Sequence, residues 1–386
     1  MKEIAQIPKR FYSLDVVRGL AALCVVLWHW QHFFYYGTVS TGFERRLEPF
    51  YSIFSIFYQK GYLAVTLFFS LSGFIFFWLY AKKIADRKIN GTSFFVLRFS
   101  RLYPLHFVTL IMVLIEQVLS KSITGTYMVY ACNDLYHFIL NVFFVSFWGF
   151  QKGFSFNAPI WSVSIEVFLY IIFFGFSFLG GARFLWITWA SAVLSLLIFF
   201  LPYEMRIGLF SFFMGGAMFL LYTKLIRFRI SSFIWIIGSV TVCLWGIALL
   251  NLRWGFVAAL INTIPNTLFI YKLISLIPNY FVSGILFPVT LLTLALLETY
   301  KGRLGSKIRF LGDISYSTYL LHFPLQLLLI LLFTVLHIGR NIFYSDIFFI
   351  VFFILLIGLS YLSFHYFEKP VQQWIRSKWL SKKSSA

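Results

Sequence analysis

Long apolar runs separated by short polar segments make up most of the 386-residue chain. A helix needs about 20 apolar residues to cross a hydrocarbon core about 30 Å thick. Ten runs have a suitable length, and they lie near residues 13–36, 61–80, 102–119, 158–180, 184–203, 207–223, 232–250, 279–298, 313–336 and 344–366. The pattern predicts a polytopic membrane protein with about ten transmembrane helices.

Two further stretches are ambiguous. Residues 136–150 form a short apolar stretch, and residues 254–272 are interrupted by Asn262, Pro265 and Asn266. Non-helical backbone at membrane depth is tolerated only where protein or a water-filled cavity covers it. The fold class that we expect is an all-α bundle with these ten helices and one or two re-entrant or interfacial segments.

The composition excludes other classes of protein. Hydrophobic residues make up 60% of the chain and charged residues 12%, whereas a water-soluble domain carries about 25% charged residues. A soluble enzyme and a disordered chain are therefore excluded. Cys24, Cys132 and Cys243 are scattered in mostly apolar surroundings, which argues against a secreted disulfide scaffold.

Positive charge predicts how the helices are oriented. The chain has 32 Lys and Arg against 13 Asp and Glu, a net charge of +19. The basic residues gather between apolar runs, as the positive-inside rule describes, so we expect no nucleic-acid partner. If every large cluster is cytoplasmic, an even number of crossings separates neighbouring clusters, which gives ten crossings and two cytoplasmic termini. These clusters are Lys2/Lys9/Arg10, Lys82 to Arg101, Lys224/Arg227/Arg229, Lys301 to Arg309 and Lys369 to Lys383.

The first run is expected to remain as a transmembrane helix. It is too long for a signal peptide and contains Asp15 and Arg18, which a signal peptide would lack. No polar stretch is long enough to hold a separate soluble domain. We expect one membrane domain over residues 10–370 and a basic cytoplasmic tail over residues 371–386.

Ionisable residues inside membrane helices are functional candidates, because a charge there is costly to keep. Arg18 and His29 are eleven positions apart, which returns to within about 20° of the same helix face and separates them by about 16 Å. Asp15 lies one turn before Arg18. Three polar groups on one stripe predict the wall of a polar channel, with His29 toward the outer side.

Glu166 is the corresponding candidate in the fourth run. Ser162 and Tyr170 lie one turn to either side of it on the same face, and Ser164 points away. If this helix enters from outside, Glu166 lies at a depth similar to that of His29. A carboxylate beside an imidazole fixes its tautomer for general-base catalysis. The alternative is an ordinary ion pair between helices.

Arg98 and Arg101 stand one turn apart in RFSRLYP, at the cytoplasmic start of the third run. Two guanidinium groups at that spacing can hold a phosphate. Alone, the pair is more typical of a lipid-headgroup anchor. The chain has no HExxH, CxxC, Walker or GxSxG pattern, so we expect no metal site.

A second polar face is predicted near the C-terminus, in DISYSTYLLHFPL. Ser315, Tyr319 and His322 share one face of a helix that is kinked near Pro324. We expect His322 in the inner half of the membrane, away from His29.

Five motifs in this order resemble the acyltransferase 3 family of bacterial membrane proteins. The resemblance runs from about Arg10 to about Pro370, and that family has ten membrane crossings. The motifs are LDVVRGLAALCVVLWH, FFSLSGFIF, RFSRLYP, NAPIWSVSIEVFLY and ISYSTYLLHFPL.

The resemblance implies transfer of an acyl group, most often acetyl from acetyl-CoA, to a carbohydrate of the cell surface, such as lipopolysaccharide O-antigen, capsule, exopolysaccharide or peptidoglycan. The expected location is the cell inner membrane, and acyl-CoA is a donor substrate rather than a bound cofactor. Gly73 would allow close approach of the pantetheine arm. We expect the catalytic residues to be Asp15, Arg18, His29 and Glu166; the donor contacts Ser72, Gly73, Arg98, Arg101, Tyr319 and His322; and the acceptor contacts Asn157, Trp161, Ser162 and Ser164.

Two alternatives stay open from the sequence. A transporter or flippase would use the same buried polar groups as a proton or solute path. An acyltransferase could instead act on a cytoplasmic or small-molecule acceptor. The sequence also leaves open whether His29 acts as a base or carries the acyl group itself, and which oligomer the chain forms.

Overall fold

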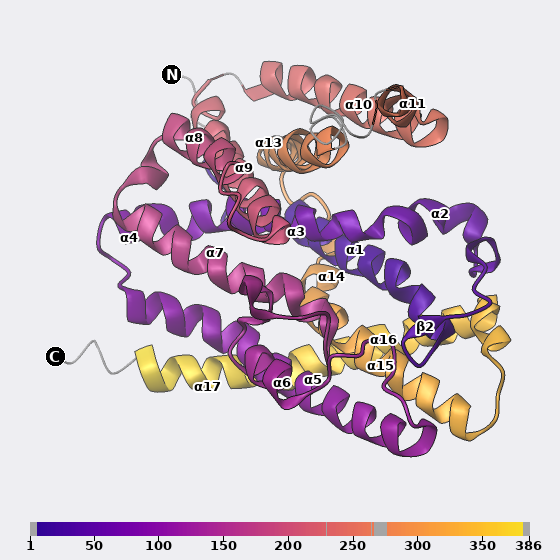
Figure 1. Cartoon of the computed structure of the whole chain (residues 1–386). Helices are drawn as coiled ribbons and strands as arrows, with labels where there is room; N and C mark the ends of the chain where they lie inside the picture. The colour runs from indigo at the N-terminus through magenta and orange to yellow at the C-terminus, as the bar shows by residue number, and fades with distance from the viewer. Residues whose placement is uncertain (1–5, 229, 264, 266–275, 381–386) are drawn as a thin grey trace. The chain divides into compact units, whose positions relative to one another are not determined.

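The described part of the protein is mostly helical. The computed structural model describes residues 6–228, 230–263, 265 and 276–380. A two-stranded antiparallel ribbon, β1 (Tyr35–Tyr36) and β2 (Val39–Ser40), pairs Tyr35 with Ser40. The helices drawn in Figure 1 are α1 (Tyr12–Trp28), α2 (Tyr51–Lys60), α3 (Ala64–Phe76), α4 (Lys82–Ala85), α5 (Gly91–Thr124), α6 (Leu135–Val142), α7 (Trp161–Phe178), α8 (Leu185–Ser195), α9 (Tyr203–Leu225), α10 (Ile230–Trp254), α11 (Phe256–Asn262), α13 (Phe287–Lys301), α14 (Phe310–Asp313), α15 (Ser315–Val335), α16 (Asp346–Ser363) and α17 (Lys369–Leu380).

Nine helical segments of the described chain are long and apolar enough to cross a membrane. They are Tyr12–Phe34, Tyr51–Ala85, Gly91–Thr124, Ala158–Phe178, Tyr203–Leu225, Phe233–Trp254, Leu276–Lys301, Ser315–Val335 and Asp346–Leu380. They match nine of the ten apolar runs and confirm an all-α, multi-pass membrane protein. The tenth run, 184–203, holds the 11-residue helix α8, which ends before Pro202 sets the start of α9.

The two ambiguous stretches form short helices in their described parts. Residues 136–150 contain all but the first residue of the eight-residue helix α6 and a separate helical turn at Ser146–Phe150. The stretch 254–272 contains α11, and residues 264 and 266–272 lie outside the described part of the chain. The predicted tail is helical as far as Leu380, because α17 follows α16 closely and packs on α5.

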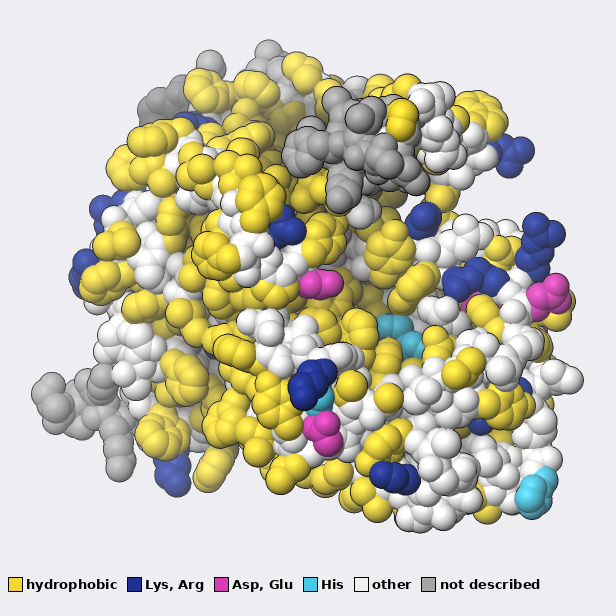
Figure 2. All heavy atoms as spheres, viewed as in Figure 1, with side chains coloured by type: hydrophobic (Ala, Val, Ile, Leu, Met, Phe, Trp, Pro, Cys, Tyr) yellow, Lys and Arg dark blue, Asp and Glu magenta, His cyan; other side chains and the backbone are white. Residues whose placement is uncertain are grey.

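The chain divides into two compact units. Unit 1 comprises residues 1–16, 66–87 and 172–309, and unit 2 comprises residues 17–65, 88–171 and 310–386. In unit 1, α9 packs against α8 and α13, and α10 packs against α13. In unit 2, α15 packs against α5 and α16. On the face drawn in Figure 2, hydrophobic side chains cover much of the surface and Lys and Arg are few, as expected where lipid is the solvent.

Unit 1 depends on a close helix crossing at Gly73. A Cβ atom on Gly73 would lie 1.8 Å from the carbonyl oxygen of Phe212 in α9, and one on Gly215 would lie 1.9 Å from that of Ser70 in α3. Small residues let membrane helices approach this closely. The prediction that Gly73 offers its open face to the pantetheine arm is therefore wrong, because α9 fills that face.

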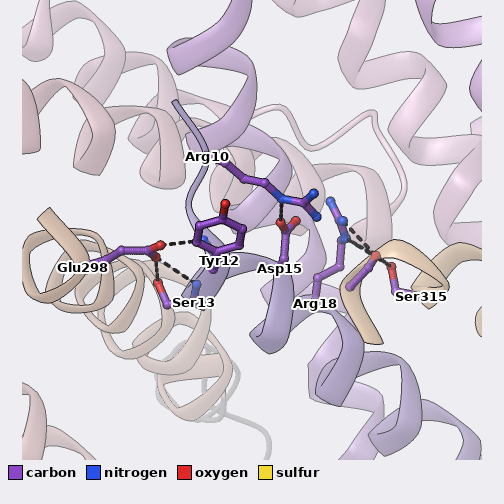
Figure 3. Close-up of polar contacts among 8 residues, drawn as sticks. Arg10, Tyr12, Ser13, Asp15, Arg18, Glu298 and Ser315 are labelled. Carbon is purple, nitrogen blue, oxygen red and sulfur yellow. Dashed lines mark hydrogen bonds and ion pairs between the residues drawn. The ribbon is translucent and has the colours of Figure 1, made fainter. Parts of the chain in front are cut away.

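The N-terminus of α1 is capped by a carboxylate from α13. Glu298 accepts hydrogen bonds from the backbone N–H groups of Tyr12 (2.7 Å) and Ser13 (2.9 Å) and from the Ser13 hydroxyl (Figure 3). The first N–H groups of a helix have no partner within the helix, and they attract negative charge. This cap satisfies them and also gives buried Glu298 its partners.

Candidate functional site

Arg18 ties α1 to the beginning of α15. Its guanidinium donates to the carbonyl oxygen of Gly312 (2.8 Å) and to the hydroxyl of Ser315 (3.1 Å), and Figure 3 shows the bond to Ser315. A Cβ atom on Gly19 would lie 2.6 Å from Leu311, so the backbones are close here. The structure thus gives Arg18 a positioning role between two helices. Asp15, in unit 1, accepts a hydrogen bond from Arg10 (2.6 Å).

The same two helices meet again at His29 and His322. After Trp28, α1 tightens into a 3-10 helix over His29–Phe34. Nδ1 of His29 lies 2.7 Å from Nε2 of His322 in α15. The two contacts follow the same order along both helices, so α1 and α15 run in the same direction here, as the charge pattern predicts. The expectation that His322 lies away from His29 is wrong.

Two polar neighbours of this pair escaped the sequence reasoning. Gln326, one turn beyond His322, donates its amide to the carbonyl oxygen of His29 (3.1 Å). His32 stacks on His29, with ring centroids 4.8 Å apart, and lies 3.3 Å from the hydroxyl of Tyr130. The signal for both was their position one turn from a candidate histidine within an apolar run.

Asn157 replaces a backbone hydrogen bond that α15 lacks. Pro324 has no N–H, so it cannot bond to the carbonyl oxygen of Leu320, four residues earlier. The Asn157 side chain, fully buried, donates to that oxygen (3.1 Å). Its prediction as an acceptor contact remains untested, but the structure already gives it this task one turn before Pro324.

α7 runs antiparallel to α15 and lines it with polar contacts. Ser162 lies 2.8 Å from the hydroxyl of Tyr319, which donates to the carbonyl oxygen of Pro159 (2.7 Å). One turn further along α7, Glu166 accepts a hydrogen bond from Tyr170 (2.7 Å). Tyr170 thus holds one carboxylate oxygen of Glu166 from within α7, and the ring of His29 bonds to a histidine. The expected pairing of Glu166 with His29 is replaced by these two contacts.

The predicted donor arginines lie near Glu166 rather than apart from it. The guanidinium of Arg98, mostly buried, stands 5.8 Å from the ring centre of Tyr170. Arg101 is half-buried, one turn along α5. Arg376 of α17 reaches the same stretch of α5 and donates to the hydroxyl of Ser100 (3.1 Å). The pair thus belongs to a basic region shared by α5 and α17.

Of the remaining predicted residues, two make contacts within unit 2 and one belongs to unit 1. Ser164 accepts from the backbone N–H of Phe147 (3.1 Å) and donates to the carbonyl oxygen of Phe144 (2.7 Å), so its hydroxyl anchors a loop. Trp161 packs on Phe147. Ser72 lies in α3 of unit 1. Among the described residues, no group of three His, Cys, Asp or Glu side chains is arranged to hold a metal ion.

The segment between β2 and α2 contains a buried carboxyl group, that of Glu48. Neither of its oxygens has a hydrogen-bond partner among the described residues. Burial raises the pKa of Glu48 from 4.5 to about 8, against the opposing charge of Arg45. Arg45 itself donates to the side chain of Gln31 (3.0 Å), two residues after His29. Glu48 is thus protonated in the folded protein at neutral pH.

We expect stability to fall as the pH rises toward 8. Between the unfolded and folded pKa values, folded Glu48 holds a proton that the unfolded chain releases, so stability decreases with pH and then levels off. Glu48→Gln removes this dependence. The melting temperature of the purified protein, measured from pH 5 to 9, should show an advantage of the variant that grows up to about pH 8. Glu44→Gln, at an exposed position of the same segment, is the control; a constant difference for Glu48→Gln would contradict the assignment.

We expect Asn157→Ala to destabilise the protein only while Pro324 is present. Losing a partner of a buried carbonyl costs about 1–3 kcal/mol. Pro324→Ala supplies an N–H to the oxygen of Leu320, so the same Asn157→Ala change should cost much less in that background. A double-mutant cycle from denaturant unfolding in detergent measures the coupling. Additive effects would show that Asn157 does not serve this carbonyl.

Comparisons with known proteins point to one family. A family model described as an acyltransferase domain, acyltransferase 3, matches residues 11–373. "Protein 2 in picA locus" of Rhizobium radiobacter is 38% identical over 103 residues, 27% of this chain and 44% of that protein. Acyltransferase MdmB of Streptomyces mycarofaciens is 29% identical over 171 residues, 42% of this chain and 38% of that protein.

The chain spans less than half the length of each of these two relatives. No solved structure matches it. The family model, in contrast, covers nearly the whole chain, including both histidines and every predicted site residue. The chain therefore belongs to the acyltransferase 3 family, and its helices are those of a multi-pass membrane protein.

Proposed function

We propose that the protein moves an acyl group, most simply acetyl, from acyl-CoA at the cytoplasmic side to a hydroxyl group of a surface carbohydrate, and that it acts in the cell inner membrane. The observation that carries this proposal is the arrangement of His29. Its Nδ1 is held by His322, and among the described residues its Nε2 makes no hydrogen bond. A free imidazole nitrogen inside a helical bundle is what acyl transfer requires.

The chemistry has two routes that begin at the same atom. As a general base, Nε2 takes the proton of the acceptor hydroxyl while its oxygen attacks the thioester carbonyl, and the proton then leaves with the CoA thiol. As a nucleophile, Nε2 attacks the thioester first and passes the acyl group to the hydroxyl. Ser162 or backbone N–H groups are candidate donors to the oxyanion.

The donor end of the site is proposed at the start of α5. Tyr316 bonds to the backbone of α5 at Leu102 (2.6 Å), so it marks the level of Arg101 on α15. His322 lies six residues further along α15, about 9 Å. An extended pantetheine arm spans that separation. Phosphates held by Arg98 and Arg101 would then place the thioester near His29, with Glu166 and Tyr170 supporting Arg98.

The acceptor is proposed from the family resemblance. Surface glycans present hydroxyl groups on the outer side of the membrane, toward which the charge pattern places His29. Tyr319 and Asn157 lie beside the histidine pair and remain proposed substrate contacts. The similarity to acyltransferase MdmB supports acyl transfer, and the name of that protein specifies no acceptor.

His29→Ala should lower acylation of the surface glycan at least about 100-fold, because removing a general base or nucleophile costs that much or more. The readout is mass spectrometry of glycans from cells that express each variant. The matched control is His106→Ala: His106 is also buried in a membrane helix, where it bonds to the carbonyl oxygen of Asn141 (2.9 Å).

The variant must insert and purify like the unchanged protein for this result to count. Full glycan acylation by a folded His29→Ala protein would contradict the assignment of His29 as the base or nucleophile. A loss of acylation with both His29→Ala and His106→Ala would indicate a general effect on folding.

Changing Arg98 and Arg101 together to Ala should weaken binding of acetyl-CoA to the purified protein by at least about tenfold, since each charged hydrogen bond contributes about 1.5–3 kcal/mol. Calorimetry measures the dissociation constant. Lys82→Ala with Lys83→Ala removes the same charge from exposed positions of unit 1 and should leave binding unchanged.

Arg101→Ala alone is the fallback if the loss of buried Arg98 prevents folding. Equal binding by the Arg98/Arg101 variant and the lysine control would rule out the phosphate site. A protein that binds no acyl-CoA at all would favour the transporter alternative.

A further inference from the structure

The bond between His29 and His322 lies in the plane of both rings. The ring planes differ by 8°, and the centroids are 5.0 Å apart, which is close to the nitrogen–nitrogen distance of 2.7 Å plus the two ring radii. The rings therefore meet edge to edge. This is the geometry in which an imidazole N–H points at the lone pair of a second imidazole.

The far side of His322 determines which ring donates. Its Nδ1 lies 2.6 Å from the backbone carbonyl oxygen of Tyr319. A carbonyl oxygen can only accept, so Nδ1 of His322 carries a proton, and in the neutral ring Nε2 is then an acceptor. His29 must donate its Nδ1–H to that acceptor. A neutral His29 with a proton on Nδ1 has its lone pair on Nε2, the nitrogen that makes no hydrogen bond.

We propose that His322 is the positioning residue of the reaction: it fixes the tautomer of His29 and takes over its proton during turnover. The inference rests on the proposed function. When Nε2 of His29 removes the proton of the acceptor hydroxyl, the proton on Nδ1 passes to Nε2 of His322. His322 is then the imidazolium, and its Nδ1–H stays bonded to the carbonyl oxygen of Tyr319. Protonation of the leaving CoA thiolate by Nε2 of His29 returns the Nδ1 proton and resets the pair.

A histidine suits this position better than a carboxylate. Both rings are buried, His29 with 9% of its surface exposed and His322 with none. A permanent negative charge at such depth would need its own partner, whereas a neutral imidazole pair carries no charge at rest. The groups that bond to the pair are themselves neutral: the carbonyl oxygen of Tyr319 bonds to His322, and the amide of Gln326 bonds to the backbone of His29. The ring of His32 stacks on that of His29.

Neighbouring contacts keep the two rings in line. Gln326 holds the backbone oxygen of His29, and Arg18 fixes the helix pair at its other end through Gly312 and Ser315. His322 is therefore built into the catalytic helix pair. This differs from a role in gripping the donor, which the sequence suggested for His322, and the two roles have different kinetic signatures.

The kinetic test compares His322→Ala, His322→Gln and the control His106→Ala in reconstituted protein. His322→Ala removes the acceptor of the Nδ1 proton, so kcat should fall about 100-fold or more with an unchanged KM for acyl-CoA. His322→Gln keeps an acceptor oxygen but cannot take up a proton. Its kcat should therefore lie between that of the unchanged protein and that of His322→Ala. A raised KM with an unchanged kcat would overturn the proposal and make His322 a donor contact.

The tautomer can also be read without any activity. Nitrogen NMR of histidine-labelled protein in lipid nanodiscs distinguishes a protonated from an unprotonated ring nitrogen, and His29→Ala identifies the signals of His29. We expect Nδ1 of His29 to be protonated and Nε2 unprotonated, and both tautomers to appear in His322→Ala. A proton on Nε2 of His29 in the unchanged protein would overturn the proposal whatever the activity.

The two tests separate the possible failures. If the unchanged protein transfers no acyl group, the proposed function fails. The catalytic role of His322 then fails too, even where the expected tautomer of His29 is seen. If acyl transfer is present but the tautomer is wrong, the proposed function stands and the role of His322 falls.

Discussion

Hydrocarbon offers no hydrogen bonds, so each buried polar group in a membrane helix must find its partner inside the protein. This constraint explains the contacts that align the helices. Pro324 frees one carbonyl oxygen of α15, and Asn157 supplies the missing donor. Glu298 receives the free N–H groups at the start of α1. Each polar group thereby fixes a helix in a defined register, which apolar packing alone specifies less sharply.

The same constraint shapes the proposed catalytic centre. A base in a bundle of apolar helices must stay neutral until substrate arrives, because an isolated charge at that depth is costly. The His29–His322 pair meets this condition, since one ring donates to the other and a backbone oxygen ends the chain of bonds. Arg98 and Glu166 both lie close to Tyr170, which bonds to the carboxylate and has its ring 5.8 Å from the guanidinium. In the proposed mechanism, charged groups would hold the donor phosphates, and the neutral histidine pair would carry out the acyl transfer.

The sequence predicted what a single helix determines, and missed what depends on neighbours. Apolar runs located the nine long helices in the described part of the chain, since length and hydropathy suffice for that. Periodicity placed His29 and Glu166 on polar faces but could not say which faces meet, so it paired them with each other. Gly73 was assigned to a ligand because a bare backbone invites close approach, and only the structure shows that α9 makes that approach. Gln326 was within reach of the sequence reasoning, as an amide one turn from His322.

A structure of the protein in nanodiscs with an unreactive thioether analogue of acetyl-CoA tests the central claim most directly. The account predicts that the phosphates of the analogue contact Arg101 and that its acyl end lies within van der Waals contact of Nε2 of His29, with the His29–His322 bond intact. An analogue whose acyl end binds away from His29 would contradict it.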